Sequence, residues 1–149
     1  MALTVILALY TSIGILAAVG TISLSARYLS PRQEQAWLAA LLVPVAAMYL
    51  AFRGYLSPAI PLGTELRPML VFAVLGLGGV RFTPLLLVGY AGHGAWDLYH
   101  EVLQRQDRLG NLTAIPLAYG AFCAAFDWWV TGYAWTRRSA WATDRRDAR

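Results

Sequence analysis

The chain has 149 residues, of which 58% are hydrophobic and only 13% are charged. Ordinary soluble domains carry about 25% charged residues, so this chain has too few polar side chains to cover a water-soluble globule. The composition therefore excludes a soluble globular domain and indicates an integral membrane protein. The single cysteine, Cys123, also excludes an internal disulfide and a zinc site built from pairs of cysteines.

The net charge of +4 does not indicate a nucleic-acid partner. All twelve basic residues are arginines, and they gather at the ends of hydrophobic segments and in the C-terminal tail, without a nucleic-acid recognition motif beside them. Membrane topology explains this distribution better than a nucleic acid would. We therefore expect no nucleic-acid partner.

The first half of the chain contains two predicted membrane spans. Residues 2–26 are uncharged, and no basic region precedes them, so they are predicted to form a first span and not a cleaved signal peptide. A polar turn follows, in which Pro31 disfavours further helix. A second span is predicted at residues 35–52, and the segment 54–63, with two prolines and two glycines, is predicted to be an interfacial or re-entrant loop.

Three further spans complete the predicted fold. A membrane-crossing helix needs about 20 mostly apolar residues, and the remaining hydrophobic segments give spans at 65–80, 82–103 and 112–136, with a polar loop at 104–111. The predicted fold class is an all-α, polytopic membrane helix bundle with five transmembrane helices. Residues 1–138 form its single domain, and 139–149 are a basic cytoplasmic tail.

The arginines predict the orientation of the chain in the cell membrane. Cytoplasmic loops are enriched in basic residues. The side that contains the tail has eight arginines and the opposite side has four, namely Arg53, Arg67, Arg105 and Arg108. We therefore expect a multi-pass protein with its N-terminus outside and its C-terminus in the cytoplasm.

Ionisable residues inside the predicted fourth span are the strongest functional signal. His93, Asp97 and His100 are spaced i, i+4 and i+7, which places them on one face of a helix. A charged residue at the centre of a span costs roughly 2.5–3.5 kcal/mol on insertion scales, so such residues normally face the interior of the bundle and have partners.

The fifth span carries a second polar row, Tyr119, Cys123 and Asp127, which can face the first. If residues are counted from the connecting loop, Cys123 is expected level with His93, and Asp127 deeper, near the middle of the bilayer. Glu65, at the outer start of the third span, is expected near His100.

These residues carry a resemblance to a known family. The motif Gly92-His93-x-x-Trp96-Asp97-x-x-His100, followed by Ile115-Pro116 and by Cys123-x-x-x-Asp127, resembles an uncharacterised family of small bacterial integral membrane proteins. The resemblance implies a shared fold and a shared site, without an established reaction. In that family a second histidine follows the one that matches His100. Glu101 stands here instead, so it either replaces a ligand or marks a lost activity.

Three roles remain open for the polar residues. They can simply form hydrogen bonds between helices, each worth about 0.6 kcal/mol. They can bind a divalent metal such as zinc or iron through His93, Asp97 and His100, with Asp127 or Glu65 as a further ligand or as the catalytic general base. They can also pass protons between the outer face and Asp127.

Two functions follow from these roles. The first is a metal-dependent membrane enzyme that acts on a lipid or an isoprenoid-like molecule, which can reach a site beneath the outer interface from the bilayer. The second is a non-catalytic accessory or assembly subunit, whose polar rows fix helix packing or pass protons. Besides the lipid bilayer, the expected partners are other membrane subunits or a second copy of the chain.

Overall fold

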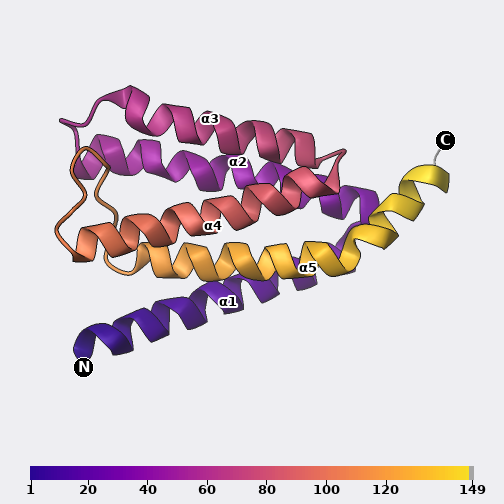
Figure 1. Ribbon diagram of the computed structural model, residues 1–149. Coiled ribbons are helices and arrows are strands. Elements are labelled where there is room, and N and C mark those ends of the chain that lie inside the picture. The colour runs from indigo at the N-terminus through magenta and orange to yellow at the C-terminus, as the bar shows by residue number, and fades with distance from the viewer. Residues whose placement is uncertain (148–149) are drawn as a thin grey trace.

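The structure is a computed structural model that describes residues 1–147. These residues form five α-helices and no β-strand (Figure 1): α1 (Ala2–Tyr28), α2 (Pro31–Leu56), α3 (Leu62–Gly79), α4 (Thr83–Arg105) and α5 (Tyr119–Asp147). The helices run roughly alongside one another in an elongated bundle. Helix α5 packs against both α1 and α4, and α3 packs against both α2 and α4. The all-helical prediction is confirmed.

Helix α2 begins four residues earlier than the sequence pattern predicts. Pro31, expected to stop a helix, is the first residue of α2, where its missing N–H is not needed for a helical hydrogen bond. Ser30 and Gln33 form a reciprocal capping box: the Ser30 hydroxyl accepts the Gln33 N–H (3.4 Å), and the Gln33 side chain accepts the Ser30 N–H (3.0 Å). The turn between α1 and α2 is therefore very short.

Helix α5 also differs from the predicted span in both of its bounds. It begins at Tyr119, because residues 106–118 form an irregular connection that contains Pro116 and a left-handed residue, Ala118 (φ 60°). It continues through most of the predicted tail to Asp147, and the last two residues of that tail lie outside the described residues. Trp141, within this extension, is fully buried in the core.

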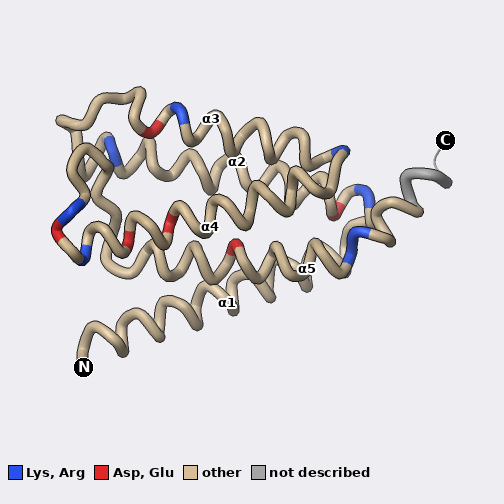
Figure 2. The backbone as a smooth tube through the Cα atoms, in the orientation of Figure 1, with Lys and Arg blue, Asp and Glu red and all other residues tan. Residues whose placement is uncertain are grey.

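Three of the described helices, α1, α2 and α3, are long and apolar enough to cross a membrane. Helix α1 is apolar on all sides, and its large side chains are exposed at positions that include Val5, Leu9, Leu16 and Leu24. A bilayer would cover such a surface. Figure 2 shows that the arginines lie at the two ends of the bundle, while its middle carries only a few acidic residues on α4 and α5.

The core of the bundle lies between α1, α2, α4 and α5. Leu38, Leu42, Leu86 and Val130 are completely buried there. Tyr90 of α4 is also buried, and its hydroxyl donates a hydrogen bond to the Leu38 carbonyl oxygen (2.7 Å). This contact fixes α4 against α2 and turns the polar face of α4 toward the interior.

Candidate metal centre

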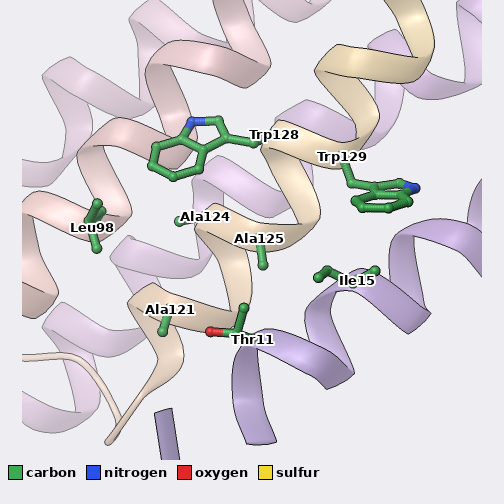
Figure 3. A pocket seen from close by; sticks show the side chains of 8 residues that line it. All are labelled: Thr11, Ile15, Leu98, Ala121, Ala124, Ala125, Trp128 and Trp129. Carbon is green, nitrogen blue, oxygen red and sulfur yellow. The ribbon is translucent and has the colours of Figure 1, made fainter. Parts of the chain in front are cut away.

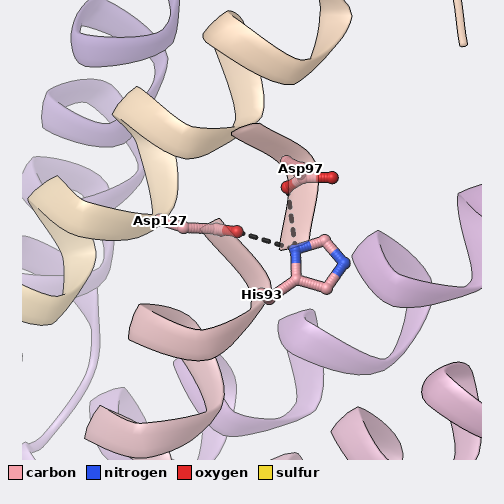
Figure 4. A group of neighbouring side chains, drawn as sticks. All are labelled: His93, Asp97 and Asp127. Atoms are coloured by element: carbon pink, nitrogen blue, oxygen red, sulfur yellow. Dashed lines mark hydrogen bonds and ion pairs between the residues drawn. The ribbon is translucent and has the colours of Figure 1, made fainter. Parts of the chain in front are cut away.

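Three ionisable side chains meet between α4 and α5. His93 and Asp97 lie one turn apart on α4, and Asp127 reaches them from α5 (Figure 4). His93 Nδ1 lies 2.7 Å from Asp127 Oδ2 and 3.0 Å from Asp97 Oδ2. One ligand atom from each residue lies within 4.8 Å of the others, and within residues 1–147 this is the one such group of three or more metal-ligating side chains.

The group is sealed inside the bundle and extends to a third helix. His93 is 1% exposed, and both aspartates are 0% exposed. Tyr49 of α2 donates its hydroxyl proton to Asp97 Oδ1 (2.8 Å). Asp127 Oδ1 and His93 Nε2 have no hydrogen-bond partner within the described chain. The centre therefore has free lone pairs in a region from which water is excluded.

The residues present fit a divalent metal ion. An imidazole nitrogen and carboxylate oxygens are the ligands that zinc and non-haem iron use in proteins. Two ionised carboxylates beside a neutral imidazole carry a charge of −2, which one divalent cation balances. That balance matters because an uncompensated charge buried this deeply is very costly.

Two glycines allow α4 and α5 to approach each other at this level. A Cβ atom on Gly94 would lie 3.1 Å from the Asp127 Cβ, and one on Gly120 would lie 2.4 Å from the backbone oxygen of Asp97. Real Cβ atoms essentially never approach another atom more closely than 3.0 Å. Gly120 therefore cannot be replaced without a shift of the backbone, whereas a side chain at Gly94 would require the side chains of Asp127 and Trp128 to move by a few tenths of an ångström.

The variant Gly120→Ala is expected to lower the stability of the protein by roughly 1–3 kcal/mol, because its Cβ would clash with backbone, which cannot rotate away. Gly132→Ala is the matched control, since nothing within the described residues lies within 4 Å of its Cβ position on the same helix. Thermal unfolding in detergent measures both. Equal melting temperatures for the two variants would show that the close approach of α4 and α5 is not required.

The other two residues predicted for the site lie outside this group. His100, one of the three predicted metal ligands, lies two turns from His93, and its Nδ1 lies 3.1 Å from the Trp96 carbonyl oxygen. Glu65, on α3, accepts a hydrogen bond from the Thr113 N–H at Oε1 (3.2 Å). Asp127, predicted as a general base or a further ligand, stands beside His93 and Asp97 instead.

The predicted depth of the second polar row is corrected by the structure. Asp127, and not Cys123, is level with His93, so α5 is displaced along α4 by four residues, about one turn, from the predicted register. Cys123 is a buried free thiol. Tyr119 packs its ring edge-on against Phe52, with 4.7 Å between the ring centroids.

Glu101 stabilises the start of α5. Its carboxylate accepts a hydrogen bond from the Gly120 N–H (3.0 Å) and pairs with Arg105. The first N–H groups of a helix have no partner within the helix, so a carboxylate there stabilises the helix start. Glu101 therefore helps to set the register of Asp127.

A second buried carboxylate, Glu34, was not among the predicted site residues. It is 0% exposed and accepts hydrogen bonds from the Trp141 indole (2.8 Å), from Arg137 (3.0 and 3.2 Å) and from the Tyr133 hydroxyl. Burial alone would lower the pKa of Arg137, but the hydrogen bonds and charge of Glu34 outweigh it and raise that pKa. The three donors, Tyr133, Arg137 and Trp141, are spaced i, i+4 and i+8 and therefore lie on one face of α5. This spacing is the signal in the sequence that could have identified the cluster.

Comparison of the chain with protein-family models, with curated proteins and with solved structures finds no match. The chemistry of the centre has to follow from its own geometry: it is a buried group of one histidine and two aspartates that could bind a metal ion.

Proposed function

We propose that this protein is an integral membrane protein that holds a divalent transition-metal ion, zinc or iron, between His93, Asp97 and Asp127. The observation that carries the proposal is the convergence of three metal-ligating atoms within 4.8 Å of one another on completely or almost completely buried side chains.

We infer that α4 and α5 are the fourth and fifth membrane spans. At 1.5 Å per residue the 23 residues of α4 extend about 34 Å, enough to cross a hydrocarbon core of about 30 Å. Helix α4 packs against α2 and α3, and α5 packs against α1 and α2. Their polar side chains reduce their overall hydropathy, but His93, Asp97 and Asp127 face the interior and not the lipid.

Cysteine labelling tests the orientation proposed from the arginines. In a Cys123→Ala background, Asn111→Cys is expected to react with a membrane-impermeant maleimide in intact cells, and Ser139→Cys only after the cells are made permeable. Both native side chains are exposed. The reverse pattern would invert the proposed topology, and equal labelling of both in intact cells would contradict α5 as a membrane span between them.

An apolar groove supports a lipid or isoprenoid-like substrate. The groove, of about 380 Å³, lies between α1, α4 and α5 and is lined by Leu98, Trp128 and neighbouring residues (Figure 3). Leu98 and Trp128 directly follow Asp97 and Asp127 in the chain, so the groove lies on the adjacent face of the same helix turns, about 100° around each helix. A groove of this size and character fits an acyl or isoprenoid chain.

In the enzyme hypothesis, the bound ion would act as a Lewis acid beside the substrate. The chain's own contribution is to position the ligands. The Tyr49 hydroxyl donates a hydrogen bond to Asp97 Oδ1 and so orients Asp97, and α5 places Asp127 beside His93. Asp127 Oδ1, which has no hydrogen-bond partner among the described residues, is the candidate proton acceptor.

Elemental analysis of the detergent-purified protein tests the metal. Wild type is expected to contain near-stoichiometric zinc or iron, and Asp127→Asn, which keeps the side-chain shape, is expected to lose the ion held at His93. Size-exclusion chromatography and melting temperature report whether the variant is still folded. A wild-type protein without metal would reject the proposed centre.

The alternative is a non-catalytic accessory or assembly subunit, favoured by one observation. The side chains of the centre contact one another directly and tie α2, α4 and α5 together. In that case elemental analysis would find no metal, and Asp127→Asn would lower stability through the weakened network alone.

A further inference from the structure

A second apolar groove lies between the end of α1 and the first turns of α2. It has a volume of about 350 Å³ and is separate from the groove beside the metal centre. Helix α1 and the residue that follows it form one wall, and a tryptophan of α2 forms the other. The lining residues are Thr21, Leu24, Ser25, Tyr28, Leu29 and Trp37.

This groove begins at the level of charged residues and extends into the apolar part of α1. Residues 2–26 are uncharged, and Arg27 has the first charged side chain of the chain. From Tyr28 to Thr21 the wall extends over seven residues, which is about 10 Å along the helix axis. One end of the groove is therefore polar, and the other lies among the apolar residues of the span.

Two exposed arginines flank the polar end of the groove. Arg27 directly precedes Tyr28, and its guanidinium carbon lies 5.5 Å from the centroid of the Tyr28 ring, which lines the groove. Arg32 is the second residue of α2 and follows the lining residue Leu29 by three positions. Neither arginine forms an ion pair with a side chain that the structure describes. Both guanidinium groups are therefore available to an external anion.

The short turn between α1 and α2 keeps the two arginines near each other. Only four residues separate them in the chain. The Leu29 N–H donates a hydrogen bond to the Ser25 carbonyl oxygen (2.9 Å), and Ser30 caps the start of α2. The backbone that carries both arginines is thus held in place before any ligand binds, which reduces the entropic cost of binding.

The surrounding charge favours an anionic ligand. Figure 2 shows arginines gathered at this end of the bundle, and within residues 1–143 Glu34 is the one acidic residue there. Glu34 is buried and paired with Arg137, so it does not neutralise Arg27 or Arg32. This is also the end that we expect to face the cytoplasm, where the membrane surface carries anionic lipids.

We propose that this groove binds one anionic phospholipid of the surrounding membrane. Its phosphate pairs with Arg27 and Arg32, because guanidinium groups form strong charge-assisted hydrogen bonds with phosphate oxygens. One acyl chain lies in the groove against Trp37. A free phosphate would leave the apolar groove unfilled, and a lipid without net charge would leave the positive charge of the arginines unbalanced. The site shares no residue with the metal centre and does not depend on it.

Native mass spectrometry in a mild detergent tests the proposal. Delipidated protein is titrated with dioleoylphosphatidylglycerol, and the dissociation constant of the first bound lipid is measured for wild type, Arg27→Gln, Arg32→Gln and the double variant. We expect each substitution to weaken binding about fivefold and the double variant roughly 25-fold, the attraction expected for one and for two arginines near an anionic lipid. Arg67→Gln removes an exposed arginine at the other end of the bundle and is expected to bind as wild type does.

A second variant tests the apolar part of the site. Trp37→Ala keeps both charges and is expected to weaken phosphatidylglycerol binding severalfold, because the acyl chain loses one wall of the groove. Arg27, Arg32 and Trp37 are all exposed, so the variants are expected to fold, and melting temperatures in lipid-free detergent check this. If one variant fails to fold, the others still decide.

The same titration distinguishes the other possible occupants. Dioleoylphosphatidylcholine has the same acyl chains without a net charge and is expected to bind more weakly than phosphatidylglycerol, and millimolar inorganic phosphate is expected not to displace the bound lipid. Equal affinities for the two lipids, or an unchanged affinity in the double arginine variant, would overturn the proposal. Displacement by phosphate would assign the arginines to a free anion, and a lipid-free dimer that Trp37→Ala separates would assign the groove to a second copy of the chain. Either result would also overturn it.

Discussion

His93→Ala is expected to remove the metal from the central site and to lower the stability of the protein by roughly 3–5 kcal/mol. Without the imidazole, Asp97 and Asp127 are left as two buried carboxylates with no partner between them. Removing one member of a buried ionic group is strongly destabilising, because the charges that remain are uncompensated. Zinc or iron content and thermal unfolding in detergent measure the two effects.

The size of this loss distinguishes the central site from its surroundings. Phe72→Leu, at a residue whose ring lies 4.9 Å from that of His93 but which has no metal-binding atom, is the control. It is expected to keep the metal and to lose far less stability, because it removes only packing. If His93→Ala retained both the metal and the wild-type melting temperature, His93 would be neither a ligand nor a required partner of the aspartates.

Glu34→Ala is expected to have a comparably large effect, at the opposite end of the bundle. The substitution removes the common acceptor of Tyr133, Arg137 and Trp141, and it leaves the Arg137 guanidinium without its carboxylate partner. Breaking a buried ion pair costs roughly 3–5 kcal/mol, and the lower end of that range is expected here because Glu34 is fully buried but Arg137 is 35% exposed. Trp141 should also become accessible to solvent, which a fluorescence quencher such as iodide detects.

Two control variants define what Glu34 does. Glu34→Gln keeps one acceptor oxygen and should lose less stability than the alanine variant. Arg32→Ala removes an exposed charge two residues away and is expected to change stability little. If Glu34→Ala unfolds at the same temperature as Arg32→Ala, the cluster does not hold the end of α5.

The helices and the polar face of α4 could be predicted because both depend on local patterns. Hydrophobic segments separated by polar or proline-containing turns identify five helices. The i, i+4 spacing of His93 and Asp97 places both on one face, and the structure brings their side chains to 3.0 Å. These inferences need only the helical repeat and the cost of a charge in an apolar environment.

The partner from α5 could not be placed because its depth depends on contacts between distant residues. The start of α5 at Tyr119 is supported by the bond from the Gly120 N–H to Glu101 and by the Gln104 side chain that holds Ile115. Hydropathy gives no sign of either contact, since Leu112 and Ile115 are as apolar as a span. The misplaced start of α5 put Asp127 four residues, about one turn, past His93 along α4.

His100 was predicted to share a metal ion with His93 because the two residues lie on the same helix face. It shares a helix face with His93, but seven residues of helix separate the two by about 10 Å along the axis. A shared face therefore does not by itself mean a shared ion. Asp127, which lies 34 positions away in the sequence, is the closer neighbour of His93.

The most direct test of the central claim is an anomalous-difference map from crystals of the metal-loaded protein, recorded at the absorption edge of the metal found by elemental analysis. We expect a peak about 2.0–2.2 Å from His93 Nδ1 and from carboxylate oxygens of Asp97 and Asp127. A map without a peak at these three residues, from crystals in which they are well ordered, would contradict the metal centre and leave them as hydrogen-bonding partners that join α2, α4 and α5.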